Sequence, residues 1–141
     1  MKDKLPFSPA PWLRTLYVFL SAPLTLVSLV DGGRLRQRLG GRLLGGEMPA
    51  RRLRGLAGLP FDLAASPAVL YGWSVVPMNL GYPLRPLLGF DGSLENAWGG
   101  PTLLGAWAVH ALGGVAFLFL MPWVVAGVVA VQSRILGRSS G

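Results

Sequence analysis

The feature that most constrains the fold is an uncharged run of 30 residues, 102–131. An α-helix rises 1.5 Å per residue, so a straight helix over this run would be about 45 Å long. The hydrocarbon core of a bilayer is only about 30 Å thick, and about 20 apolar residues suffice to cross it. The run therefore predicts a membrane-spanning helix that tilts or bends near Pro122.

The composition of the whole chain points in the same direction. Charged residues make up 13% of the sequence and hydrophobic residues 52%, whereas a soluble domain carries about 25% charged residues. The chain has no cysteine and one histidine, which excludes disulfide frameworks, thiolate chemistry and sites that need two imidazoles. No nucleophile and base stand in a recognisable motif, so we expect a protein that is not an enzyme.

Two further apolar runs complete the predicted fold. Residues 63–82 form a second predicted span, bordered by Asp62. Residues 15–30 form a shorter run interrupted by Pro23, which we expect either to span the membrane or to re-enter it from one side. The sequence thus predicts an all-α, integral membrane helical hairpin of the spans 63–82 and 102–131, preceded by the short kinked segment, in a single domain.

The basic residues predict the topology. Much of the net charge of +7 comes from residues 31–55, and Arg134 and Arg138 follow the last apolar run. Because basic residues beside spans stay in the cytoplasm, segment 31–55 and the C-terminus are expected there, with the Pro/Gly-rich loop 83–101 outside. We expect a multi-pass protein of the bacterial cytoplasmic membrane. The side of the N-terminus depends on the first segment and stays open.

Leucines recur every fourth residue in the basic segment, at Leu35, Leu39 and Leu43, beside a parallel row of arginines. This pattern is typical of a short amphipathic helix lying on the inner leaflet, where arginines bind anionic lipid headgroups. A solvated loop that only sets topology is the alternative. Nucleic acid is not an expected partner, since no aromatic residues interleave with the arginines. The predicted headgroup and topology residues are Arg34, Arg36, Arg38, Arg42, Arg51, Arg52 and Arg54.

The candidate functional residues lie in the longest apolar run. His110 is the single imidazole, and an ionisable residue at membrane depth suggests function. Its side chain would be a tetrapyrrole ligand, a pH switch, or a neutral group that hydrogen-bonds a neighbouring helix. The last of these is the interpretation that we favour, and it needs no cofactor. Close packing of this helix against another is predicted from three small residues, Gly105, Gly113 and Gly114. The expected partners are other membrane proteins, and a second copy of this chain is the alternative.

Several short motifs together touch most of the chain. They are Trp12-x-x-x-x-Tyr17 with Pro23-Leu24, the arginine and leucine segment ending at Gly45, Trp98-Gly99-Gly100-Pro101, Gly105-Ala106-Trp107-Ala108-Val109-His110, Met121-Pro122-Trp123 and the Arg-Ile-Leu-Gly sequence at 134–137. With these motifs the chain resembles the sensor-domain family of actinobacterial membrane proteins, which often stands ahead of a histidine kinase. The C-terminal half matches best.

The resemblance implies a sensor-like membrane protein that relays a membrane or envelope cue to a separate partner by helix–helix contact. The cue would be read by the 83–101 loop or by the glycine-rich face. The sequence departs from the family because its first half lacks a return helix and no kinase follows Gly141. The alternative is an accessory structural subunit of a transporter, respiratory or pigment-binding complex.

Overall fold

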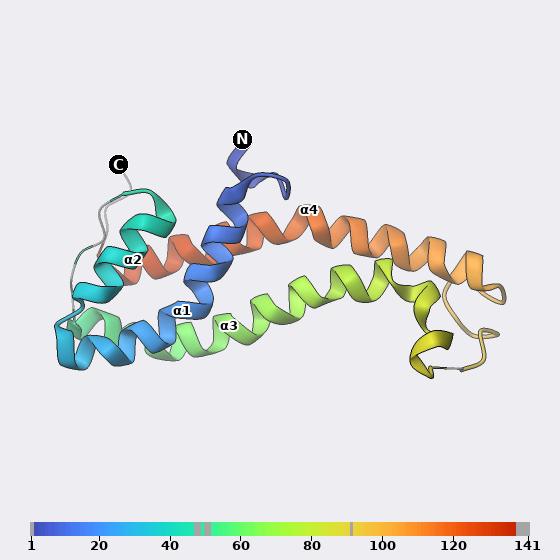
Figure 1. Ribbon diagram of the computed structural model, residues 1–141, viewed down its shortest axis with the longest axis horizontal. Helices are drawn as coiled ribbons and strands as arrows, with labels where there is room; N and C mark the ends of the chain where they lie inside the picture. The colour runs from blue at the N-terminus through green and yellow to red at the C-terminus, as the bar shows by residue number, and fades with distance from the viewer. Residues whose placement is uncertain (1, 47–48, 50–51, 91, 138–141) are drawn as a thin grey trace. The chain divides into compact units, whose positions relative to one another are not determined.

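The computed structural model describes residues 2–46, 49, 52–90 and 92–137, and this part of the chain is helical without a strand. The predicted all-α fold class is therefore confirmed. The α-helices labelled in Figure 1 are α1 (Pro9–Asp31), α2 (Arg34–Leu44), α3 (Arg52–Leu80) and α4 (Leu103–Leu136). Three short 3₁₀ helices accompany them, η1 (Lys2–Lys4), η2 (Tyr82–Leu84) and η3 (Pro86–Leu88).

Two of these helices, α1 and α4, are long and apolar enough to cross a membrane. The first apolar segment is longer than the run 15–30, because α1 has 23 residues and continues through Pro23. Most of the predicted span 63–82 lies in α3, which ends at Leu80 and is not one of these two helices. That helix begins at Arg52 and takes in the charged residue Asp62.

The chain divides into two compact units, Met1–Val69 with Pro122–Gly141, and Leu70–Met121. The first unit holds α1, α2, the beginning of α3 and the end of α4. The second holds the end of α3, the two 3₁₀ helices η2 and η3, and the beginning of α4.

A tight turn separates α1 from α2 in the first unit (Figure 1). Gly32 and Gly33 have φ angles of 70° and 90°, a left-handed conformation that glycine adopts without a steric cost. The Asp31 carboxylate accepts hydrogen bonds from the backbone N–H groups of Gly33 and Leu35, each at 2.7 Å. It thereby satisfies donors at the start of α2 that have no partner within that helix.

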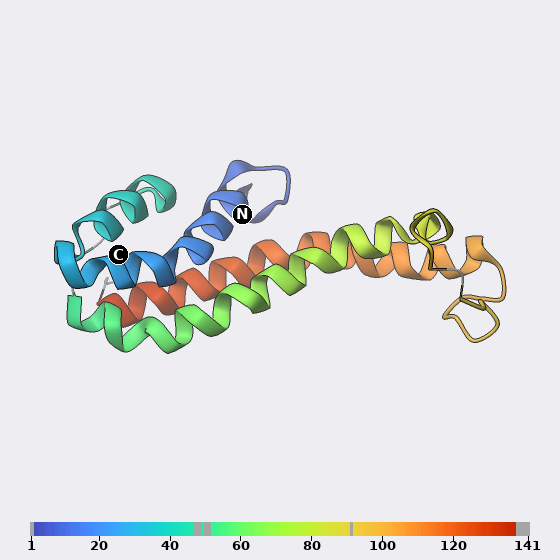
Figure 2. The same ribbon diagram turned by 60° about the horizontal axis from the view of Figure 1, so that its bottom comes forward.

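Close contact in the second unit depends on Gly114 of α4. A methyl group there would lie 3.1 Å from the Asn79 Cβ and the Leu80 Cγ, and 3.2 Å from the Val76 carbonyl oxygen. The Trp107 indole N–H donates to the Leu80 carbonyl oxygen at 3.0 Å, near the end of α3. These contacts hold the end of α3 and the beginning of α4 side by side, as Figures 1 and 2 show.

Candidate functional site

A group of buried polar side chains lies in the first unit. We call this group the polar cluster; it consists of Ser21, Thr25, Arg36, Asp62 and Gln132. The five residues come from all four α-helices. Buried charges are rarely tolerated unless they are paired and hydrogen-bonded, so the partners of each decide what the cluster does.

Asp62 is the acceptor at the centre of the polar cluster, with 1% of its surface exposed. Its Oδ2 atom lies 3.0 Å from Arg36 Nη2, which forms a salt bridge, and 3.2 Å from the Thr25 hydroxyl. Its Oδ1 atom accepts a hydrogen bond of 2.8 Å from Gln132 Nε2. Bonds to the ionised carboxylate come from α1, α2 and α4, so these helices converge on one residue of α3.

Arg36 is the matching cation, and it is 6% exposed. Besides its salt bridge with Asp62, it donates from Nη1 to the Thr25 hydroxyl and from Nε to the Tyr17 hydroxyl, the latter at 3.4 Å. Gly55 of α3 lies beside the guanidinium, where a Cβ would be 3.5 Å from Nη1. The planar guanidinium thus reaches several acceptors at once, which an ammonium could not do in the same way.

Gln132 carries the one unpaired buried side-chain atom found among the described residues. Its Nε2 atom donates to the Ser21 hydroxyl at 3.0 Å and to Asp62, whereas Oε1 has no hydrogen-bond partner. The Asp62 carboxylate fixes this amide orientation, because only the NH₂ group can donate to an ionised oxygen.

The position of Arg36 corrects one prediction made from the sequence. Its side chain binds Asp62 inside the protein, so it is not a headgroup residue. Arg34, Arg38 and Arg42 are exposed on α2, and Arg54 is exposed on α3. Arg51 lies outside the described residues, as does the side chain of Arg52. The salt bridge explains the exception, since Arg36 faces the opposite side of α2 from its neighbours.

A second candidate site lies in the other unit, where the end of α3, η2 and η3 meet α4. We call it the loop-end cavity; its volume is about 590 Å³. It is lined by Pro77, Met78, Asn79, Gly81, Tyr82, Leu84, Arg85, Leu88, Phe90 and His110. Its size and apolar walls with a few polar groups are typical of small-molecule sites.

The polar groups of the loop-end cavity are stacked on one another. The Tyr82 and His110 rings lie 4.0 Å apart with 23° between their planes. The Arg85 guanidinium lies 4.8 Å from the centre of the Tyr82 ring, and its Nη1 atom donates to the Tyr82 hydroxyl at 2.7 Å. His110 Nδ1 is 2.8 Å from the Ala106 carbonyl oxygen, which can only accept a hydrogen bond. In the neutral ring, Nε2 is therefore the acceptor.

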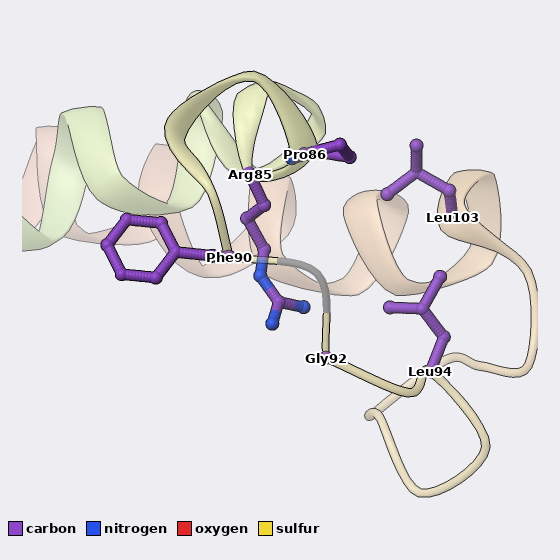
Figure 3. Close-up of a pocket in the computed structure, with 6 residues that line it drawn as sticks. All are labelled: Arg85, Pro86, Phe90, Gly92, Leu94 and Leu103. Atoms are coloured by element: carbon purple, nitrogen blue, oxygen red, sulfur yellow. The ribbon is translucent and has the colours of Figure 1, made fainter.

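Arg85 also borders a smaller cavity of about 240 Å³. Figure 3 shows its side chain reaching toward Gly92, with Leu94 and Leu103 on the far side of the opening. Phe90 lines both cavities. Arg85 and Phe90 are thus shared by the two cavities.

The three glycines predicted from the sequence have different surroundings. Gly114 contacts α3 of its own chain, as described above. A Cβ at Gly105 would overlap the Gly99 carbonyl oxygen, whereas one at Gly113 would only meet Asn79 Oδ1 at 3.9 Å. The close approaches of Gly105 and Gly114 in this structure are thus made to other parts of the same chain.

The sequence prediction included His110 but left the polar cluster out. One signal for the cluster was present, because Ser21, Thr25 and Ser28 are spaced by four and three residues in an apolar helix. Residues at this spacing lie on one helix face. All three are buried.

Comparisons with known proteins give no further guide to either site. No family model matches the sequence, and no curated protein or solved structure is significantly similar to it.

Proposed function

We propose that this chain is a sensor-like membrane protein that holds a ligand in the loop-end cavity and relays its presence to a separate membrane partner. The observation that carries the proposal is the cavity itself, in which Arg85, Tyr82 and His110 converge among apolar walls. Such a concave apolar site with few polar groups is the usual form of a ligand pocket.

The location in a membrane is part of this proposal. Helices α1 and α4 have the length and the hydropathy that a membrane-spanning helix needs. Helix α4 also exposes large apolar side chains, among them Leu112, Leu120 and Trp123. In water these side chains would be costly, whereas lipid tails or a partner helix would cover them. The relay would proceed through such helix–helix contacts.

A blocked cavity tests the proposal. Leu88 lines the cavity and is 68% exposed, so Leu88→Trp fills space at small cost to folding. An extract of lipids and metabolites from native membranes should raise the melting temperature of the wild type by several degrees, because a ligand at 100 times its Kd stabilises by about 2.7 kcal/mol. The Leu88→Trp variant should not respond. An equal response of both proteins would contradict the proposal.

The outer face of α2 gives a second prediction, on its lipid partner. Replacing Arg34, Arg38 and Arg42 by Gln should weaken binding of the solubilised protein to vesicles rich in phosphatidylglycerol, because each arginine near an anionic surface contributes about 1 kcal/mol. Phosphatidylcholine vesicles should show no difference, and raised salt should reduce the effect. Unchanged binding to the anionic vesicles would show that these arginines face water.

A pigment-binding subunit is the second candidate function. It is favoured by one observation, the hydrogen bond that fixes His110 Nδ1 and leaves Nε2 as the acceptor. In histidines that bind metals, the ring nitrogen that does not bind the metal commonly donates to a carbonyl or carboxylate oxygen in this way. Protein purified from native membranes would then absorb visible light, and His110→Ala would remove the band.

A further inference from the structure

We propose that the ligand of the loop-end cavity is an anionic amphiphile, with a phosphate-type headgroup at Arg85 and an acyl tail along the apolar walls. The inference rests on the proposed function and names the chemical class of its ligand. Its support comes from the charge of the cavity, the character of its walls and the position of His110.

Arg85 supplies a fixed positive charge. Its guanidinium is half-buried, lies over the Tyr82 ring and donates one hydrogen bond to the phenol. These contacts hold the cation in place through an aromatic ring and a hydroxyl group, not through a carboxylate. Among the described residues no carboxylate forms a salt bridge with Arg85. The remaining N–H groups suit a phosphate or carboxylate, which guanidinium binds with two parallel hydrogen bonds.

The walls around this charge are apolar. Met78, Leu84, Leu88 and Phe90 line the cavity, and each is exposed. A small hydrophilic anion would satisfy Arg85 but leave these side chains uncovered. A neutral hydrocarbon would cover them but leave the guanidinium desolvated and unpaired, which is costly. A molecule that joins an anionic group to a tail satisfies both requirements.

His110 extends the polar part of the cavity along α4. It follows the first residue of that helix by seven positions, which corresponds to about 10 Å along the axis. Its Nε2 atom accepts hydrogen bonds in the neutral ring, so it suits a hydroxyl group near the headgroup. Arg85 and His110 face the same cavity from different segments of the chain, and Tyr82 lies between them.

Native mass spectrometry of the purified full chain tests the class of ligand. The probes are dioleoyl phosphatidic acid, dioleoyl phosphatidylcholine with the same tails, and inorganic phosphate as competitor. We expect phosphatidic acid to bind at least tenfold more tightly than phosphatidylcholine. Arg85→Gln should remove this preference, and Leu88→Trp should remove binding of both lipids. The matched control is Arg134→Gln, which removes an exposed arginine of α4 that lines neither cavity and should change neither result.

The other outcomes separate the two proposals. If both lipids bound equally well and Leu88→Trp abolished their binding, the inference of an anionic headgroup would be overturned. The cavity would remain a ligand site. If inorganic phosphate by itself displaced the lipid, the ligand would be a free anion, and the inference of an acyl tail would be overturned. If Leu88→Trp left lipid binding unchanged, or if no lipid bound, the proposal that the cavity is a ligand site would be overturned as well. Circular dichroism of each variant identifies loss of fold, and Arg85→Lys, which retains the charge, should keep part of the preference.

Discussion

Replacing Asp62 by Leu should lower the free energy of unfolding by about 3–5 kcal/mol, the cost of leaving a buried charge unpaired. The unpaired charge is on Arg36, a residue that is 6% exposed and would lose its salt bridge. Thr25 and Gln132 would lose an acceptor at the same time. Unfolding in mixed micelles with increasing dodecyl sulfate, followed by circular dichroism, measures the loss.

A double variant shows whether the loss comes from the ion pair. Arg36→Leu together with Asp62→Leu removes both charges, and apolar replacement of a whole buried pair is often close to neutral. We expect it to recover most of the stability lost in the single variant. Glu95→Ala is the control, since Glu95 is exposed and a surface change costs within about 0.5 kcal/mol. Equal losses in the single and double variants would contradict the interpretation.

The second large effect is expected at Gly114. Gly114→Leu should destabilise the second unit by at least about 1–3 kcal/mol, because even the first carbon of the new side chain meets backbone and side-chain atoms of α3 at 3.1–3.2 Å. The obstacle includes the Val76 carbonyl oxygen, which belongs to a helix and cannot move alone. A red shift of tryptophan fluorescence should accompany the loss as Trp107 separates from Leu80.

The neighbouring glycine provides a matched control. Gly113→Ala introduces a methyl group 3.9 Å from its nearest neighbour, an ordinary contact, and alanine favours a helix by about 1 kcal/mol over glycine. This variant should be as stable as the wild type or more so. If the two positions responded alike, the contact between α3 and α4 at Gly114 would not be the cause.

Apolar runs and helix periodicity predicted much of the fold. All but the first residue of the run 102–131 lies within α4, because an uncharged segment of that length has few alternatives to a helix. The apolar run 15–30 alone does not decide between a span and a re-entrant segment, yet Pro9 and Trp12 belong to the same helix and lengthen it. Proline at the first helical position carries no N–H that needs a partner, so a helix can begin there.

The polar cluster could not be assembled from the sequence because its partners are distant along the chain. Asp62 follows Arg36 by 26 positions, and Gln132 follows Asp62 by 70. Helix periodicity does distinguish Arg36 from the arginines beside it. Successive helical residues are about 100° apart, so Arg36 faces away from Arg34 and Arg38, which are themselves four apart. Only the position of α3 shows that Arg36 faces Asp62.

The long separation between the members of the polar cluster has a consequence for biosynthesis. Arg36 is made 26 residues before the carboxylate that neutralises it, and Gln132 is made 70 residues after that carboxylate. While the ribosome is still adding α4, Asp62 lacks the amide that binds its Oδ1 atom. Packing of the first unit is therefore completed only once Gln132 has been made, and an insertion machinery that released α1 and α2 early would release an unpaired cation.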